Sequence, residues 1–218
     1  MSYVQIAVDG PAGSGKSTIA KKIAERLNIT YIDTGAMYRA LTYKVLINNI
    51  DIENEDAIIE LARKSKIEFL QDNIYLDNDI VNEEIRLPKV SKNVSYVAKI
   101  PQVRKILVDV QRKLALNQDV VMDGRDIGTY VLKDANLKIF LTATVEERSR
   151  RRYSELKNKG LDVTFDDVRK DIINRDKIDK ERKFAPLIEA DDAIVIDTTD
   201  LSVEDVVDKI TSILEGGQ

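Results

Sequence analysis

The 218-residue sequence has neither cysteine nor histidine. Without cysteine, the chain cannot form a disulfide framework, a thiolate metal site or a cysteine nucleophile. Without histidine, it cannot form a Ser–His triad or a histidine-ligated zinc site, and it lacks the commonest general base. Any chemistry must therefore use carboxylates, lysine, arginine, hydroxyl groups, backbone amides or a hard cation held by oxygen ligands.

Long hydrophobic runs are also missing. No stretch approaches the about 18 apolar residues that cross a bilayer, and the apolar run at residues 3–8 is too short for a signal peptide. The net charge of −4 argues against a nucleic-acid partner, because proteins that bind polyanions usually carry a basic balance or stripe. With 43% hydrophobic residues the chain can bury a sizeable core, and we expect a cytoplasmic protein without a nucleic-acid or membrane partner.

Short β-branched runs alternate along the chain with stretches of helical periodicity. Apolar runs too short for helices predict core strands at residues 4–8, 31–32, 120–122, 139–141 and 193–196. Helical patterns lie at residues 17–27, 36–46, 57–62, 103–116 and 144–156, and capping-box patterns begin at 164 and 202. This alternation predicts an α/β fold with a parallel central sheet and helices on both faces, whose ligands bind at the carboxyl ends of the strands.

Residues 66–81 follow a different pattern. Three short apolar–polar alternating runs are separated by polar breaks at 71–73 and 77–79. Such alternation is typical of a small antiparallel meander. Because it lies between helical segments, we expect this meander in an insertion rather than in the main sheet.

A glycine-rich segment after the first strand fits the pattern G-x-x-x-x-G-K-[ST] at every position from 10 to 17. Glycines let the backbone wrap a phosphate with its N–H groups pointing inward, and the following helix adds its positive end. Lys16 can reach the β- and γ-phosphates, and the Ser17 hydroxyl can ligate Mg²⁺. The residues expected to hold ATP are Gly10, Pro11, Ala12, Gly13, Ser14, Gly15, Lys16, Ser17 and Thr18.

The phosphate-binding loop does not specify a reaction, because GTPases, motor ATPases and small-molecule kinases share it. The Asn-Lys-x-Asp guanine reader of a GTPase is absent from the sequence. After the second strand, Thr34 and Gly35 suit a helix start that can bind an anion, and Arg39 lies one turn further on. The same residues also fit an ordinary N-cap with a solvated arginine.

The segment from Asp123 to Asp126 follows another apolar strand. Asp123 occupies a Walker-B-like place, where a carboxylate can hold Mg²⁺, and Arg125 stands at the same edge of the sheet. A charged β-turn is the alternative interpretation.

Two further segments carry clustered arginines. Arg148, Arg150, Arg151 and Arg152 crowd one stretch, which is either a lid that closes over polyphosphate or an acid-paired, solvated helix. Arg175, Asp179 and Arg182 recur at spacings of four and three, which places them on one helix face. They are either a clamp for phosphate and sugar hydroxyls or an ordinary set of intrahelical pairs.

Together these segments favour phosphoryl transfer, which needs positioning and charge neutralisation more than covalent chemistry. A phosphate acceptor attacks with an oxygen that is already anionic. It therefore needs no strong general base, which suits a chain without histidine.

The set of motifs resembles the bacterial cytidylate kinase family, within the nucleoside monophosphate kinases. The matching stretches are residues 6–18, 33–39, 123–129 and 175–187, and the combination with Asp-Gly-Arg-Asp-x-Gly-Thr is far more specific than the loop alone. The resemblance implies a three-layer P-loop fold with an inserted meander plus helices and a helical lid. It also implies ATP-dependent phosphorylation of CMP and dCMP with Mg²⁺.

The resemblance also divides the chain into regions. Residues 1–33 and 106–218 are expected to form the P-loop core. Residues 34–105 are expected to bind the monophosphate and to contain the inserted small domain, and residues 146–165 to form the lid.

The family's residue roles carry over onto matching positions. Ser95, Arg104 and Asp126 would read the cytosine ring, Arg39, Arg125 and Arg182 the acceptor phosphate, and Arg175 and Asp179 the sugar hydroxyls. Lys16, Arg148 and Arg152, together with Arg125 and Arg182, would neutralise the transferring group. Thr34 stands where the family often has serine, and the expected metal ligands are Ser17, Asp33 and Asp123.

Two alternatives stay open at this point. One is another P-loop kinase with a hydroxyl acceptor, of the shikimate or dephospho-coenzyme A type, in which Asp33 serves as the base. The other is a binding module that hydrolyses ATP slowly to change partners. For the kinase we expect a monomer whose partners are the nucleotides ATP, CMP and dCMP.

Overall fold

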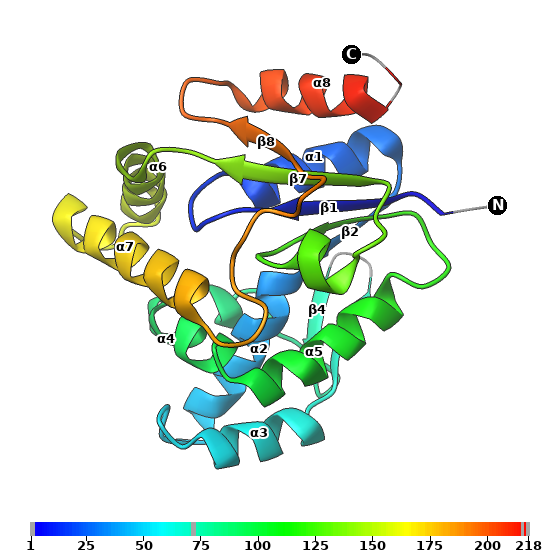
Figure 1. Cartoon of the computed structure of the whole chain (residues 1–218). Coiled ribbons are helices and arrows are strands. Elements are labelled where there is room, and N and C mark those ends of the chain that lie inside the picture. The colour runs from blue at the N-terminus through cyan, green and yellow to red at the C-terminus, as the bar shows by residue number, and fades with distance from the viewer. Residues whose placement is uncertain (1–2, 71–72, 215, 217–218) are drawn as a thin grey trace.

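The computed structural model describes residues 3–70, 73–214 and 216, and its centre is a five-stranded parallel sheet (Figure 1). The strands lie in the order β2-β6-β1-β7-β8. Their bounds are β1 Gln5–Asp9, β2 Thr30–Asp33, β6 Val120–Asp123, β7 Leu137–Thr142 and β8 Ile194–Asp197. This sheet confirms the predicted α/β architecture, and β1, which leads into the phosphate-binding loop, lies in its middle.

Helices cover both faces of the sheet because successive side chains of a strand point to opposite sides. Ile6 and Val8 of β1 pack in one apolar cluster with α1 (Lys16–Leu27) and α8 (Val203–Leu214), and Ala7 joins a second cluster on the other face. That second cluster contains residues of α5 (Pro101–Leu114) and of η2 (Ile127–Val131), a single turn of π-helix. The three-layer fold follows from this two-sided burial.

The chain leaves the sheet after β2 and returns at β6. In between it forms α2 (Thr34–Ile47), α3 (Glu55–Lys64), β3 (Ile67–Leu70), β4 (Asn73–Leu76), β5 (Asp79–Ile80), η1 (Glu84–Arg86), α4 (Pro88–Ala98) and α5. The three strands form an antiparallel sheet in the order β3-β4-β5, as the alternation predicts; of the first polar break, residues 71 and 72 lie outside the described residues, and Asn73 already begins β4. This excursion has its own apolar core, which includes Leu41, Ile58, Ile74, Val97 and Leu107.

The helix α4 has no counterpart among the elements expected from the sequence. Pro88 occupies its first turn, where a proline costs no hydrogen bond. Val90, Val94 and Val97 are buried at spacings of four and three, so a helical pattern is present but is carried by β-branched residues of modest helix propensity. Packing against α2 and the surrounding elements outweighs that propensity.

The basic stretch forms α6 (Val145–Asn158), and α7 (Phe165–Glu181) packs against it (Figure 1). Each helix begins with a threonine cap. The Thr144 hydroxyl accepts from the Glu147 amide at 3.2 Å, and the Thr164 hydroxyl accepts from the Asp167 amide at 3.1 Å. The helix starts predicted at 164 and 202 are confirmed.

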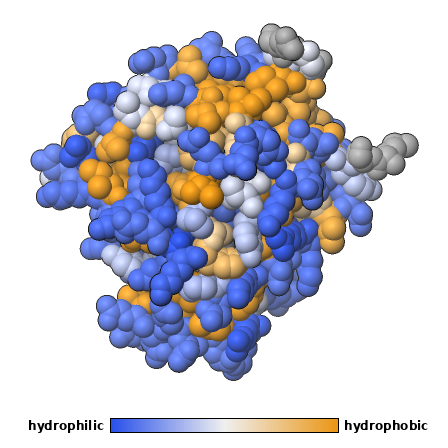
Figure 2. Space-filling view, viewed as in Figure 1, coloured by the Kyte–Doolittle hydropathy of each residue, from blue (hydrophilic) through white to orange (hydrophobic). Residues whose placement is uncertain are grey.

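The surface seen from the side of Figure 1 is mostly hydrophilic, and hydrophobic residues gather toward α8 (Figure 2). No helix in the described part of the chain is long and apolar enough to cross a membrane.

Candidate active site

A cleft of about 840 Å³ lies at the carboxyl ends of the strands, between the phosphate-binding loop and the excursion. Most of the predicted site residues line it: Ala12, Gly13, Gly15, Lys16, Ser17, Thr18, Asp33, Thr34, Arg39, Ser95, Arg104, Asp123, Arg125, Asp126, Arg152, Arg175, Asp179 and Arg182. Gly10, Pro11, Ser14 and Arg148 are not among its lining residues. Residues far apart in the sequence therefore meet at the edge where a parallel sheet binds its ligands.

The phosphate-binding loop needs glycine for two separate reasons. A Cβ on Gly10 would come to 2.0 Å from the carbonyl oxygen of Leu141 on β7, and Gly10 has φ +146°. Gly15 caps α1 with φ 89°, a left-handed conformation that other residues adopt at a cost. The first requirement is steric and the second conformational, and both let the loop turn directly from β1 into α1.

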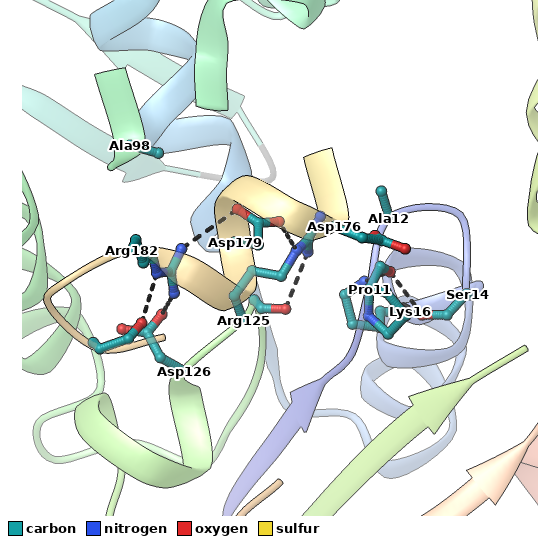
Figure 3. Close-up of polar contacts among 12 residues, drawn as sticks. Pro11, Ala12, Ser14, Lys16, Ala98, Arg125, Asp126, Asp176, Asp179 and Arg182 are labelled. Atoms are coloured by element: carbon teal, nitrogen blue, oxygen red, sulfur yellow. Dashed lines mark hydrogen bonds and ion pairs between the residues drawn. The ribbon is translucent and has the colours of Figure 1, made fainter. Parts of the chain in front are cut away.

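Lys16 lies buried in the loop. Its Nζ donates to the Pro11 carbonyl at 2.7 Å and lies 3.4 Å from the Ser14 hydroxyl (Figure 3). Burial and the nearby Arg125 guanidinium lower the pKa of Lys16 well below its ordinary value. An anion at this place would favour the charged ammonium, since opposite charge offsets both effects.

Next to the loop, Asp123 is held by two hydroxyl groups. Ser17 Oγ donates to Oδ2 at 2.9 Å, and the phenol of Tyr31 donates to Oδ1 at 2.8 Å. Burial and the charge of Asp33 raise the pKa of Asp123 to about 6. A carboxylate beside a hydroxyl, both oxygen donors at a phosphate-binding loop, is the ligand chemistry that Mg²⁺ prefers, so these residues fit the metal.

Asp33 has a different set of contacts. Its Oδ1 accepts from the Ala36 amide at 2.9 Å and caps α2, and its Oδ2 accepts from Arg39 at 2.6 Å. Both oxygens are thus engaged by α2. Within the described ranges no group of three or more His, Cys, Asp or Glu residues could hold a metal ion, so the fit to Mg²⁺ rests on Ser17 and Asp123.

At the far end of the cleft, Arg104 and Asp126 are paired. Arg104 Nη2 lies 2.7 and 2.6 Å from the two carboxylate oxygens, and its Nη1 donates to the Ala98 carbonyl at 3.0 Å. The guanidinium lies over the Tyr38 ring, 5.1 Å from its centroid. Ser95 is buried and lines the cleft one turn before Ala98 on α4, the residue whose carbonyl Arg104 contacts. The three residues expected to read a base are therefore gathered at one end of the cleft.

Between the two ends lies a cluster of arginines around Asp179 (Figure 3). Arg125 Nε donates to Asp179 Oδ2 at 2.9 Å, and Arg182 Nη1 lies 3.6 Å from Oδ1. Burial alone would raise the pKa of Asp179, but Arg125, Arg182 and Arg175 outweigh it and hold the pKa below its ordinary value. In Figure 3, Arg125 and Asp179 stand between the phosphate-binding loop and the Asp126–Arg182 contact.

This cluster carries more positive than negative charge. Burial and Arg125 lower the pKa of Arg175 to about 10. Arg175 Nε, Arg182 Nη2 and Arg104 Nε are buried without a hydrogen-bond partner in the described part of the chain. Buried donors are normally paired, so three such atoms around one cleft point to an anionic, hydrogen-bond-accepting ligand.

The arginines of α6 separate into different environments. Arg148 is buried, donates to the carbonyls of Ala12 and Ala143 at 2.9 Å each, and pairs with Asp176 of α7 at 2.7 Å. Arg152 lines the cleft and pairs with Glu155 at 2.6 Å. Arg151 lines the cleft as well, so acid-paired surface contacts and two arginines facing the cleft occur on the same helix.

Sequence reasoning missed four polar residues that shape the site: Asp9, Tyr31, Tyr38 and Asp176. Tyr31 lies two residues before Asp33 on a strand whose carboxyl end was already expected to face the ligand, so its position was a usable signal. The other three act through contacts that no local pattern reveals.

A parallel sheet with β1 feeding a lysine-bearing phosphate-binding loop, faced by an arginine-lined second site, defines a P-loop kinase. The family model for cytidylate kinase matches residues 6–216, and the chain belongs to the cytidylate kinase family. It is 69% identical over 216 residues to the cytidylate kinase of Alkaliphilus oremlandii (strain OhILAs), covering 99% of this chain and 100% of that one. It is 57% identical to the cytidylate kinase of Clostridioides difficile (strain 630), covering 97% of this chain and 98% of that one.

Solved structures with the same fold are far more distant in sequence. An uncharacterized protein from Eubacterium ventriosum has a TM-score of 0.54 at 16% identity, covering 99% of both chains. Shikimate kinase from Bacteroides thetaiotaomicron has a TM-score of 0.53 at 15% identity, covering 98% of this chain and 99% of that one. These likenesses confirm the predicted fold class, and the family resemblance read from the motifs is confirmed by the relatives.

Proposed function

We propose that the protein transfers the γ-phosphoryl group of ATP to the phosphate of CMP or dCMP, giving ADP and CDP or dCDP. The observation that carries this proposal is a pair of buried arginine N–H groups without a hydrogen-bond partner among the described residues, Arg175 Nε and Arg182 Nη2, between the phosphate-binding loop and the Arg104–Asp126 pair. An acceptor with a phosphate at one end and an amino-bearing base at the other, joined by a sugar, matches that order of groups.

The donor half of the proposal uses the loop and α1. The loop amides and the N-terminus of α1 bind the polyphosphate, and Lys16 neutralises the β- and γ-phosphates. Ser17 and Asp123 would hold Mg²⁺, with the negative charge of Asp33 close by. When bound, the metal offsets the charge on the phosphate oxygens and so favours attack by another anion.

The acceptor half uses the rest of the cleft. Arg39, Arg125 and Arg182 bind the acceptor phosphate, Arg175 and Asp179 bind the sugar hydroxyls, and Ser95, Arg104 and Asp126 read the base. The hydroxyl of Thr34, which is expected to contact the nucleotide, donates to the Asp123 carbonyl at 2.7 Å and so connects the start of α2 to β6.

Base discrimination follows from the Asp126 carboxylate. A carboxylate can only accept, so it suits the exocyclic amino group of cytosine. Uracil carries an oxygen in place of that amino group, so two hydrogen-bond acceptors would face each other with no hydrogen between them. Leaving a buried acceptor without a hydrogen bond costs about 1–3 kcal/mol. We therefore propose that CMP and dCMP are preferred to UMP.

The transfer step needs no general base in this proposal, because the attacking phosphate oxygen is anionic. Lys16, Arg125, Arg182 and Arg152 neutralise the transferring group. Arg148, whose guanidinium is bound to the Ala12 carbonyl, acts on it through the loop. The core consists of residues 1–33 and 106–218, and the lid within it spans residues 146–165. Closure of this lid and of the monophosphate-binding region, residues 34–105, excludes water, which would otherwise hydrolyse ATP.

We further propose that the protein works as a monomer in the cytoplasm, with small nucleotides as its partners. The support for this proposal is that the polar groups named in the acceptor and donor halves line a single cleft of this chain.

The test is ADP release from ATP and Mg²⁺ in the presence of CMP, dCMP, UMP, AMP, GMP or shikimate, each supplied alone. Strong turnover with CMP and dCMP, and weak turnover with the others, is the expected result. If no monophosphate stimulates ADP release, the acceptor assignment is wrong. Turnover with shikimate alone would favour a hydroxyl acceptor instead.

A further inference from the structure

Asp9, at the end of β1, carries a buried carboxylate that the proposed mechanism does not use. Its two oxygens accept hydrogen bonds from consecutive backbone amides, Oδ1 from Ile127 at 2.8 Å and Oδ2 from Gly128 at 2.7 Å. The side chain thus spans 118 residues of sequence to hold the first turn of η2. Among the described residues no ion pair of Asp9 occurs, and its partners are these two amides.

The turn that Asp9 holds begins directly after Asp126. The carbonyl of Asp126 accepts from the amides of Tyr130 at 2.9 Å and Val131 at 3.1 Å, and the next amide in the chain, that of Ile127, is the one bound by Asp9. The peptide group that follows Asp126 is therefore fixed at both its oxygen and its nitrogen. This fixes the backbone from which the Asp126 carboxylate reaches Arg104.

Asp9 is also the residue immediately before Gly10, where the phosphate-binding loop starts. Its strand, β1, is hydrogen-bonded on one side to β6 and on the other to β7, so the loop end of β1 is held independently of the Asp9 side chain. The η2 turn depends on that side chain for two amide partners. Loss of the carboxylate should therefore displace Asp126 and leave the phosphate-binding loop in place.

The side-chain type is informative. An ionised carboxylate accepts with both oxygens and offers no donor, whereas asparagine accepts with one atom and would turn an N–H group toward the second amide. Burial raises the pKa of Asp9 to about 6 even though the two amides favour the charged form. The two amides are thus the groups that offset the cost of burying this carboxylate.

We propose that Asp9 is a positioning residue that sets the base-reading carboxylate of Asp126 at a fixed distance and angle from the phosphate-binding loop. The inference rests on the proposed function, because it assigns Asp9 to the site that reads the acceptor base. Displacement of a reacting or recognising group by about 1 Å can lower the rate about 100-fold. A residue that holds Asp126 in place relative to the phosphate-binding loop therefore affects the rate of the reaction.

The test compares the wild type with Asp9→Asn, after the wild type has been shown to phosphorylate CMP. KM and kcat are measured for ATP, CMP and UMP, and CMP binding is measured by calorimetry without ATP. We expect Asp9→Asn to lower kcat/KM for CMP about 10-fold or more and to narrow the CMP-to-UMP preference by a similar factor, as for the loss of a buried hydrogen bond. The KM for ATP should stay within about twofold, because the loop is held by β6 and β7.

The matched control is Ile210→Ala, which removes a buried side chain from the α8 side of the core and destabilises the protein away from the cleft. It should leave the CMP-to-UMP preference unchanged. If Asp9→Asn yields no soluble protein, Asp9→Glu, which keeps the charge and lengthens the side chain, is measured in the same way and should also narrow the preference.

Three results would overturn the inference: an unchanged preference in the Asp9 variant, equal rises in KM for ATP and CMP, or a matching loss of preference in Ile210→Ala. If the wild type itself fails to phosphorylate CMP, the proposed function is wrong, and that failure is separate because it appears before any variant is compared.

Discussion

Arg104 and Asp126 form an ion pair in which one nitrogen, Nη2, lies 2.7 and 2.6 Å from the two carboxylate oxygens, and both side chains are buried. Burial would lower the pKa of Arg104, but Tyr38 and Asp126 outweigh it and raise the pKa above its ordinary value. A buried pair of this kind is a weak source of net stability, yet removal of one partner leaves the other charge uncompensated. The pair therefore ties base recognition to stability.

Replacement of Arg104 by methionine should affect both properties. We expect a loss of about 3 kcal/mol in the free energy of unfolding, since Asp126 keeps only the more distant Arg182 at 3.4 Å. The KM for CMP should rise about 10-fold or more while the KM for ATP stays nearly constant. Urea denaturation and initial-rate kinetics check these results. Lys113→Met, which removes an exposed cation from the same helix, should change neither quantity, and an unaltered CMP KM in Arg104→Met would contradict the assigned role.

Two arginines of α6 should separate structural from catalytic effects. Arg148→Met removes donors from the Ala12 and Ala143 carbonyls and takes the arginine partner from the mostly buried Asp176, so it should cost about 3 kcal/mol of stability. Arg152 is 29% exposed and paired with Glu155, so Arg152→Met should change stability by less than about 0.5 kcal/mol. It should instead lower kcat about 100-fold, because the substitution removes a positive charge that neutralises the transferring phosphoryl group. Thermal denaturation and saturation kinetics on both variants test this; equal stability losses would contradict it.

The two glycine environments give a clean steric comparison. Gly10→Ala places a Cβ 2.0 Å from the Leu141 carbonyl oxygen, so β1 and β7 must separate, and we expect a loss of about 3 kcal/mol together with loss of ATP binding. Gly160 also has positive φ, +74°, but nothing lies within 4 Å of its Cβ position. Gly160→Ala should therefore cost only about 1 kcal/mol and preserve ATP binding. Chemical denaturation and ATP calorimetry compare the two, and similar losses would show that conformation rather than contact dominates at Gly10.

Titration of Asp9 should make the free energy of unfolding depend on pH. Its pKa is about 6 in the folded protein and 3.8 as the ordinary value, so between these values the folded state binds the proton more tightly. Stability from this group is therefore greatest at low pH and falls as pH rises through about 4 to 6, by about 3 kcal/mol in total. Asp9→Asn lacks this component. Urea titrations from pH 4 to 7 should show the wild type losing stability relative to the variant as pH rises; parallel curves would contradict the expectation.

Local patterns predicted the loop, the parallel sheet and the meander, because each depends on residues close in sequence. They could not decide which of the four neighbouring arginines face the cleft, since the rotation of α6 is set by packing against α7 and the loop. Arg148, expected at the transferring group, lies buried against Ala12 instead, and its role there stays a prediction. The contact of Asp9 with η2 joins segments over 100 residues apart, and a single sequence holds no sign of such a pairing.

The path of the chain between β2 and β6 has a consequence for how such kinases diversify. These strands are neighbours in register, with Asp33 opposite Asp123, so the whole excursion leaves the sheet and returns to it at adjacent strands. Length or sequence can change within the excursion without altering the pairing of β1, β6 and β7. The part of the acceptor half that the excursion supplies, from Thr34 to Arg104, can thus vary independently, while Asp126, the arginines of the core and the ATP-binding loop stay in place.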